Sequence, residues 1–360
     1  MIARRRATGR LRTAALLLLL HTACAPPPAP PADRTAAAPP HEPAAETTRT
    51  GLTMGSQLTV TVLSSDREGA GAAIDAVFAE FERLDGRLSV WKAESEVSQV
   101  NAAAGAHAVA VGSDLIALLR TARQVSTWTS GRFDVTFAAL SDVWRFDHDQ
   151  DGRVPTPDEI AVRRPLIDYR RVEIDEPRQT VFLPVRGMRL HLGGIGKGYA
   201  VDRSAALLRA RGFRDFLIQS GGDLYVSGRR QGRPWRLGIA DPRRPADVFG
   251  TLDLSDGTLS TSGDYERAFV KDGVRYHHLI DPGTGQPARG CRSVTIVASS
   301  PVVADALSTG VFILGAREGM ALVERLPDVE AVIVSDTNEV FVSTGLRAAF
   351  RLVRPPGEGI

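Results

Sequence analysis

The sequence predicts a mixed α/β (α+β) fold, built as one large domain or as two intertwined lobes, and not a Rossmann fold. Strand-like and helix-like segments interleave without the steady β-α-β alternation that a parallel sheet needs. About 310 residues follow the N-terminal region, which is enough to bury a large core. A Rossmann glycine fingerprint spaced from Gly194 and Gly196 would need a further glycine where Tyr199 stands.

Residues 1–23 have the parts of an export signal. Five arginines precede the apolar run Ala14–Leu20, and small residues precede Cys24. The run is too short to span a bilayer comfortably. Thr22-Ala23-Cys24 resembles a lipoprotein cleavage box with a lipidated cysteine, although His21 stands where leucine is usual. Cleavage by an ordinary signal peptidase is the alternative.

Amino-acid composition divides the rest of the chain into a tether, a main domain and a tail. Ala25–Ala45 is rich in proline and alanine, so residues 24–50 are expected to form an extended tether with no packed core. Residues 51–350 are expected to form the main domain, and residues 351–360 a C-terminal tail.

Charge and cysteine content narrow the function classes. Loss of residues 1–23, which hold five arginines and no acidic residue, changes the formal net charge from +2 to −3. No basic footprint for nucleic acid therefore remains. The only cysteines are Cys24 and Cys291, so lipidation of Cys24 leaves Cys291 as a lone thiol.

Apolar periodicity predicts the elements of the N-terminal half. Alternation predicts a strand over Met54–Leu63. Helical spacing predicts helices over Glu68–Leu84 and Asp114–Thr127, with a short helix capped by Ser95 between them. Phe133–Trp144 is predicted to be a loop that leads into a short helix. Val172–Leu192 is predicted to form strands with turns at Pro177 and Gly187.

The stretch Leu190–Asp223 organises the rest of the chain. A short apolar strand breaks at Gly193-Gly194, a helix follows, and a second strand ends at Gly221-Gly222. Glycine allows close backbone approach to a ligand, and helix N-termini favour anions, so a phosphate-bearing ligand is expected. A P-loop is excluded, because His191 and Gly198 stand where that motif needs glycine and Ser or Thr. A tight strand-to-helix turn is the structural alternative.

Strand signals dominate the C-terminal half. The predicted strands are Trp235–Ile239, Val248–Leu254, Leu259–Ser262, Ala268–Lys271, Val274–Ile280 and Ser293–Ala298. Val302–Leu314 has helical spacing, and a final helix with two or three strands completes the chain.

Two segments carry side chains suited to chemistry. Asp305 and Thr309 lie four residues apart on one helix face, where their oxygens suit Mg²⁺; a capping aspartate and a self-bonded threonine are the structural alternative. His277 and His278 lie among polar turn residues, and either can act as acid or base near neutral pH.

Eight segments, in this order, together resemble the FAD:protein FMN transferase family, formerly called thiamine-biosynthesis lipoproteins. They are MGSQLTVTV, LDGRLSVWKAESEVSQVN, GRFDVTFAALSDVW, GGIGKGYAVD, SGGDLYVSG, TSGDYERAF, YHHLIDPGTGQP and ADALSTGVFILG. The resemblance runs from about Met54 to about Leu346.

The resemblance implies an exported, Mg²⁺-dependent enzyme that binds FAD in a cleft of its own fold and splits the pyrophosphate. FMN is then linked by a phosphoester to a Ser or Thr of an exported flavoprotein, and AMP is released. The enzyme would face the periplasm or cell surface, held to the membrane by a lipid on Cys24.

Matched position by position, the resemblance also implies the site residues. The implied metal ligands are Asp305, Thr309 and the Gly194 carbonyl, and the implied catalytic residues are His278 and Asp305. The implied FAD contacts are Met54, Trp91, Arg132, Phe133, Asp134, Lys197 and Ile280. His277 falls where the family varies.

Three residues depart from the family pattern. His191 replaces an aspartate that contacts FAD, Arg145 replaces a glycine after Trp144, and Trp91 stands in place of tyrosine. A neutral imidazole at His191 can still hydrogen-bond, and tryptophan can stack on flavin or adenine.

Asp147–Asp158 partly matches an EF-hand loop. Pro155, Pro157 and the missing twelfth-position glutamate argue against calcium binding there. Thr156 and Glu159 instead predict a capping box at the start of a helix.

Two other functions stay open at this point. One is an FAD pyrophosphatase that releases FMN and AMP, and the other is a non-catalytic, lipid-anchored flavin-binding protein. The presence of Asp305, Thr309 and His278 argues against the second.

Overall fold

A computed structural model describes residues 45–359, all within one compact unit. The export signal, Cys24 and residues 24–44 of the expected tether lie outside the described residues. Among residues 45–359, no helix is long and apolar enough to cross a membrane.

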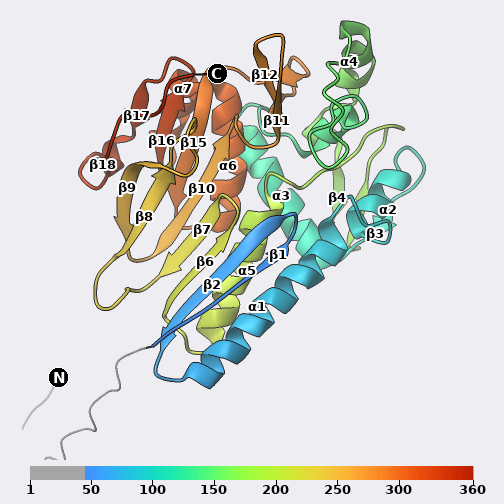
Figure 1. Cartoon of the computed structure of the whole chain (residues 1–360). Coiled ribbons are helices and arrows are strands. Elements are labelled where there is room, and N and C mark those ends of the chain that lie inside the picture. Colours follow the sequence, from blue (N-terminus) through green and yellow to red (C-terminus); the bar gives the residue numbers. More distant parts are fainter. Residues whose placement is uncertain (1–44, 360) are drawn as a thin grey trace, which may run out of the picture. The chain divides into compact units, whose positions relative to one another are not determined.

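The core of the unit is an eight-stranded sheet in which all neighbouring strands are antiparallel (Figure 1). Its strands, in spatial order, are β1 (Ala45–Thr53), β2 (Ser56–Ser64), β6 (Asp215–Ser220), β7 (Asp223–Ser227), β10 (Gly257–Gly263), β15 (Cys291–Ala298), β16 (Val329–Ser335) and β17 (Val340–Val342). The predicted mixed α/β fold is confirmed, and the sheet is not a Rossmann sheet.

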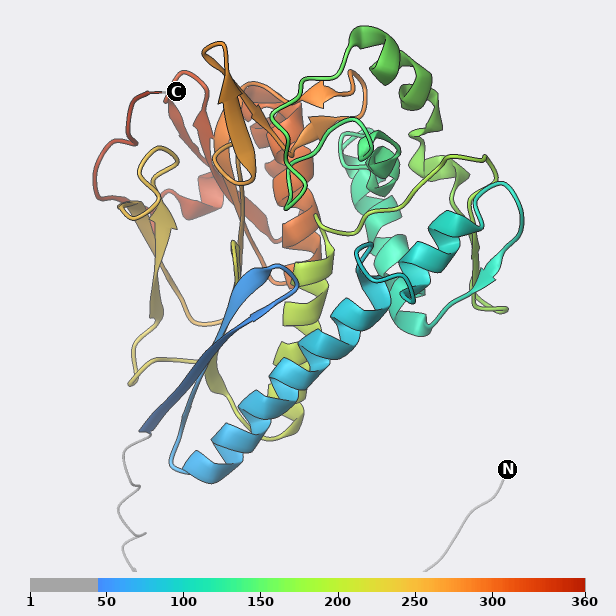
Figure 2. The same cartoon turned by 45° about the vertical axis from the view of Figure 1, so that its right-hand side comes forward.

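One face of this sheet is covered by helices (Figure 2). They are α1 (Arg67–Leu88), α5 (Gly196–Ala210), α6 (Pro301–Leu314) and α7 (Ala316–Val323), and α3 (Ser113–Trp128) packs against α6. In α1, Ile74, Val77 and Phe81 recur at helical spacing and are fully buried. Its N-terminus is capped by the Asp66 carboxylate, which accepts a hydrogen bond from the Gly69 amide at 2.8 Å.

The opposite face packs against a three-stranded sheet of β8 (Trp235–Ala240), β9 (Val248–Leu254) and β18 (Arg351–Leu352). A separate apolar cluster joins the two sheets, with Trp235 and Phe249 from the small sheet and Val226 and Val334 from the large one. Side chains of the central strands point alternately toward the helices and toward the small sheet. Both faces of the large sheet are therefore buried.

The remaining elements are short. They are α2 (Glu96–Ala102), β3 (Val109–Ala110), the 3₁₀ helix η1 (Val135–Leu140), α4 (Pro157–Arg163), η2 (Arg164–Leu166), η3 (Tyr169–Arg171), β4 (Glu173–Asp175), β5 (Thr180–Phe182), β11 (Ala268–Lys271), β12 (Val274–His277), β13 (Ile280–Asp281), β14 (Gln286–Pro287) and η4 (Thr344–Leu346). The predicted Ser95 cap and the Thr156/Glu159 capping box are both confirmed.

Four boundaries differ from the sequence expectation. β1 begins at Ala45, inside the range expected to be tether, because its threonines pair with β2. Leu190–Leu192 is not a strand, since the Asn101 side chain bonds both backbone groups of Leu190. The predicted strand Val274–Ile280 is broken after His277. The tail begins with β18, which pairs with β9.

Candidate active site

The three predicted metal ligands lie at the contact between α5 and α6. A Cβ added to Gly194 would lie 3.3 Å from the Thr309 hydroxyl, so the Gly194 backbone faces that side chain. One turn earlier on α6, the buried Asp305 carboxylate accepts a hydrogen bond from the Gly198 amide at 2.8 Å. The structure therefore brings Gly194, Asp305 and Thr309 to one place.

These ligands fit a hard cation. A carboxylate, a hydroxyl and a backbone carbonyl are the oxygen donors that Mg²⁺ accepts in proteins. Burial, followed by the negative charge of Asp223, raises the pKa of Asp305. Among residues 45–359, Asp305 has no ion-pair partner within 4.0 Å, so its ionised form calls for a nearby positive charge.

A half-buried lysine provides a positive charge at this site. Lys197, in the first turn of α5, lies 3.2 Å from the Asp223 carboxylate and donates to the Gly193 carbonyl at 3.3 Å. Burial alone would lower the pKa of Lys197, but the charges of Asp223 and Asp305 outweigh it and raise the pKa. Lys197 is therefore positioned and charged to attract an anionic group.

Hydroxyl groups connect the lysine side of the site to the metal side. Ser260 donates to Asp223, and Ser262 lies 2.8 Å from the Ser308 hydroxyl and 3.3 Å from that of Thr309. Ser308 in turn donates to the Asp305 backbone carbonyl at 2.8 Å, so hydrogen-bonding hydroxyls of β10 and α6 lie between the two buried carboxylates.

Gly198 sets how closely α5 and α6 approach each other. A Cβ on this residue would lie 2.4 Å from the Pro301 carbonyl oxygen and 2.6 Å from the Asp305 Cβ. Gly198→Ala is expected to destabilise the fold by about 1–3 kcal/mol through overpacking. Gly86→Ala in α1, where a Cβ meets nothing within 4 Å, should be neutral or mildly stabilising. Denaturant unfolding of both variants checks this, and equal stabilities would contradict it.

The two neighbouring histidines are bonded differently. His277 is buried; its Nε2 lies 3.0 Å from the Ala288 carbonyl, and its Nδ1 accepts from the Leu279 amide at 3.3 Å. His278 is half-buried, and its Nδ1 lies 3.1 Å from the Glu266 carbonyl. A carbonyl can only accept, so Nδ1 of His278 carries the proton and Nε2 keeps its lone pair.

The electrostatic environment keeps His278 neutral. Burial, and next the positive charge of Arg267, lowers the pKa of His278 well below 6.5, with Lys197 acting in the same direction. Arg267 and Lys197 also lower the pKa of Asp305. Arg267 and Lys197 therefore lower the pKa of both His278 and Asp305.

Met54 occupies the turn between β1 and β2. Met54 and Gly55 both have positive φ, 48° and 69°, as a two-residue type I′ hairpin requires. A non-glycine residue held in this conformation at a candidate site is consistent with a ligand contact. The turn lies near Lys197, because Ser56 and the Lys197 side chain both approach Gly221.

Three further predicted FAD contacts are Arg132, Phe133 and Ile280. Arg132 forms an ion pair with Asp281 at 2.7 Å, which joins the loop before η1 to β13. The ring of Phe133 lies 3.4 Å from a Cβ built on Gly194. Ile280 is buried in the apolar cluster around Trp144.

Two of the predicted FAD contacts have other partners. Asp134 is buried and caps η1, accepting from the Thr136 amide and hydroxyl and from the Tyr169 amide. Its carboxylate therefore has a structural role. Trp91 is 56 % exposed, and its ring meets the edge of His148 with the centroids 4.6 Å apart.

Two residues that depart from the family pattern, His191 and Arg145, have defined partners in the structure. Burial, followed by the charge of Arg267, lowers the pKa of His191 to about 4, so this imidazole is neutral. Its Nδ1 accepts from the Gly193 amide at 3.0 Å and shapes the glycine turn. Arg145 lies 4.0 Å from Asp149 and 3.5 Å from Asp151.

The acidic loop Asp147–Asp158 is organised by arginines. Besides the Arg145 contacts, Asp147 pairs with Arg267 at 3.1 Å. Within residues 45–359 there is no group of three or more His, Cys, Asp or Glu side chains arranged to hold a metal ion. The capping box confirms the expectation that a helix starts at the end of this segment.

Sequence reasoning missed Asp223 and Glu266 as members of the site. Asp223 follows the glycine pair Gly221-Gly222, and Glu266 lies in the segment TSGDYER. The proximity of Asp223 to Lys197 and of Glu266 to His278 depends on the packing of distant segments, which residue spacing does not reveal.

The fold is that of a class that includes solved flavin transferases. An ApbE protein from Thermotoga maritima has a TM-score of 0.79 and 31% sequence identity, covering 85% of this chain and 100% of its own. The flavin transferase ApbE from Vibrio cholerae has a TM-score of 0.77 and 27% identity, with 85% and 100% covered. A histidine-to-glycine variant of that enzyme has the same scores.

The chain belongs to the ApbE family, whose model matches residues 54–333. An FAD:protein FMN transferase from Treponema pallidum is 34% identical over 294 residues, covering 76% of this chain and 80% of the relative. One from Klebsiella pneumoniae is 32% identical over 299 residues, covering 82% and 92%.

Proposed function

We propose that this chain is an exported, Mg²⁺-dependent FAD:protein FMN transferase. It cleaves the pyrophosphate of FAD, attaches FMN by a phosphoester bond to a Ser or Thr of an exported flavoprotein, and releases AMP. The observation that carries the proposal is the cluster at the contact between α5 and α6, where the buried Asp305 carboxylate, the Thr309 hydroxyl and the Gly194 backbone meet the first turn of α5, which carries Lys197.

The side chains suit the steps of this reaction. The acceptor hydroxyl gives its proton to Nε2 of His278 as its oxygen bonds to the FMN phosphorus, and the bond to the AMP oxygen breaks. Lys197 attracts the phosphate oxygens. Mg²⁺ held by Asp305, Thr309 and the Gly194 carbonyl would neutralise charge on those oxygens. Two bonds exchange at phosphorus, and no redox change is needed.

Mass measurement of the acceptor separates this function from its rivals. Purified protein is incubated with FAD, Mg²⁺ and candidate exported proteins, and each candidate is then weighed. Gain of one FMN on a Ser or Thr, with AMP released, supports the transferase. Release of FMN and AMP into solution without a mass gain supports the pyrophosphatase. Bound, uncleaved FAD supports the flavin-binding protein.

The sequence before Ala45 supports export and lipid anchoring as part of the proposal. The expected result is that Cys24→Ser moves the protein from the membrane fraction to the soluble fraction, because one lipid signal is lost. Cell fractionation, with intact-mass measurement of the mature N-terminus, tests this. A wild-type chain that is already soluble and begins at another residue would refute the anchor while leaving the activity untouched.

A further inference from the structure

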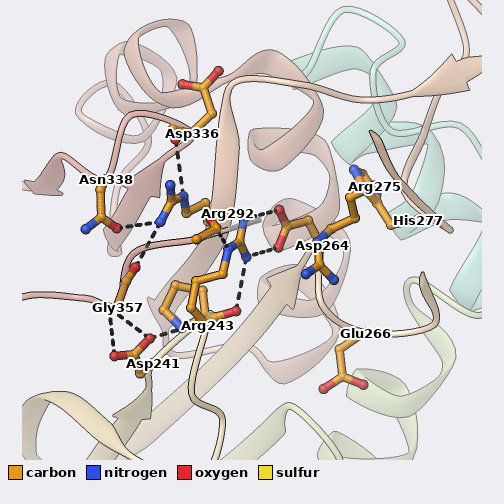
Figure 3. A network of polar contacts seen from close by, with 12 residues as sticks. Asp241, Arg243, Asp264, Glu266, Arg275, His277, Arg292, Asp336, Asn338 and Gly357 are labelled. Atoms are coloured by element: carbon orange, nitrogen blue, oxygen red, sulfur yellow. Dashed lines mark hydrogen bonds and ion pairs between the residues drawn. The ribbon is translucent and has the colours of Figure 1, made fainter. Parts of the chain in front are cut away.

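Beside the site, a buried ion pair joins two loops. Arg243, in the loop between β8 and β9, donates to both carboxylate oxygens of Asp264 at 2.7 and 2.8 Å (Figure 3). Both side chains are about nine-tenths buried, at 9 % and 10 % exposure. Two parallel bonds from a guanidinium fix the orientation of the carboxylate as well as its position.

The C-terminal residues hold Arg243 in place. Its Nε donates to the Gly359 carbonyl at 3.1 Å. The fully buried Asp241 carboxylate accepts from the Gly357 amide at 2.8 Å and from the Arg243 amide at 2.9 Å. Arg292 donates to the Gly357 carbonyl at 2.9 Å. Gly357 is therefore bonded both to Asp241, in the loop that carries Arg243, and to Arg292 (Figure 3).

Asp264 begins the turn that holds the active-site histidine. The Asp264 amide donates to the Arg292 carbonyl at 3.0 Å, so the backbone of this residue is fixed as well as its side chain. Two residues later, the Glu266 carbonyl accepts from Nδ1 of His278 at 3.1 Å. A shift of this turn would remove the acceptor that keeps the proton on Nδ1.

We infer that Arg243 and Asp264 form a positioning pair for His278, and that the C-terminal residues Gly357–Gly359 lock this pair. The ion pair fixes the turn, the Glu266 carbonyl holds Nδ1–H, and Nε2 is left free to accept a proton. Neither Arg243 nor Asp264 touches the reacting groups in this arrangement. The consequence for FMN transfer rests on the proposed function, whereas the consequence for the histidine tautomer does not.

The tautomer of His278 gives a direct test. In protein labelled with ¹⁵N-histidine, two-bond ¹H–¹⁵N correlations distinguish the Nδ1–H form from the Nε2–H form, and His278→Ala assigns the signals. The wild type is expected to show the Nδ1–H form. Arg243→Lys, which loses the bidentate fork, and truncation after Pro356 should each give a mixture of tautomers. Once an acceptor protein is identified, kcat for FMN transfer should be about 10- to 100-fold lower in both altered proteins than in the wild type, with KM for FAD unchanged.

Arg236→Lys is the matched control. Arg236 also bonds both oxygens of an aspartate, Asp253, at 2.8 and 3.0 Å, on β8 and β9 of the same small sheet. The Arg236→Lys variant should therefore leave the His278 tautomer unchanged. An unchanged His278 tautomer in both the Arg243→Lys and the truncated protein, each folded by circular dichroism, would overturn the inference. Altered tautomers in a protein that shows no FMN transfer would support the positioning pair and refute the transferase.

Discussion

Replacement of His278 by alanine is expected to slow FMN transfer by about 10²–10⁴-fold, the usual contribution of a positioned general base. The hydroxyl of a Ser or Thr is a weak nucleophile, and Nε2 of His278 is free to accept its proton because Nδ1 is bonded to the Glu266 carbonyl. FAD affinity should change little, because the histidine acts on the acceptor proton. Transfer rates and FAD binding, measured on the same preparation, separate the two effects.

His277→Ala is the neighbouring control. Both nitrogens of His277 are already bonded, to the Ala288 carbonyl and the Leu279 amide. Its loss leaves these buried groups unpaired, which typically costs about 1–3 kcal/mol of stability. The transfer rate of the folded variant should fall far less than that of His278→Ala. Equal losses of rate, or a His278→Ala defect confined to FAD binding, would remove His278 from the role of base.

The pH profile follows from the direction of the pKa shift. Burial and the charge of Arg267 lower the pKa of His278 below 6.5, so the neutral, proton-accepting form persists into mildly acidic solution. As pH falls, transfer should therefore be lost only below 6.5, where an unperturbed histidine would already be half protonated. Rates measured across the acid range, with acceptor folding monitored, test this sign.

The fold could be predicted wherever one face of an element is buried. α1, α3 and α6 were predicted from apolar spacing because their buried stripes pack on the sheet or on each other. β1 was missed because its side chains are mostly exposed and polar, so nothing distinguishes it from tether in sequence. Its strand structure comes from pairing with β2, a tertiary effect.

The sequence predicted the proximity of site residues only where those residues lie close together in the chain. Asp305 and Thr309 share a helix, so their spacing alone brings them together. The pairing of Lys197 with Asp223, and of Ser262 with Thr309, depends on which strands lie beside β10 and on how α5 crosses α6. The tail contact of Arg243 with Gly359 spans still more of the chain and has no local signal.

Asp305→Asn is expected to abolish Mg²⁺-dependent FMN transfer while the protein stays folded. The amide side chain can still accept the bond from the Gly198 amide, so the contact between α5 and α6 is kept. What is lost is the negative charge that a hard cation needs among otherwise neutral oxygen ligands. Asp305→Ala and treatment of the wild type with EDTA should have the same effect on transfer.

Stability measurements give this prediction a readout besides activity. Burial and the charge of Asp223 raise the pKa of Asp305, so its ionised form opposes folding when no cation is bound, and Asp305→Asn should not lower the melting temperature in EDTA. Mg²⁺ should raise the melting temperature of the wild type by binding the folded state, and should leave that of Asp305→Asn unchanged. Asp253→Asn, on β9 and paired with Arg236, should respond to Mg²⁺ like the wild type. A full Mg²⁺ response and full transfer in Asp305→Asn would remove this residue from the metal site.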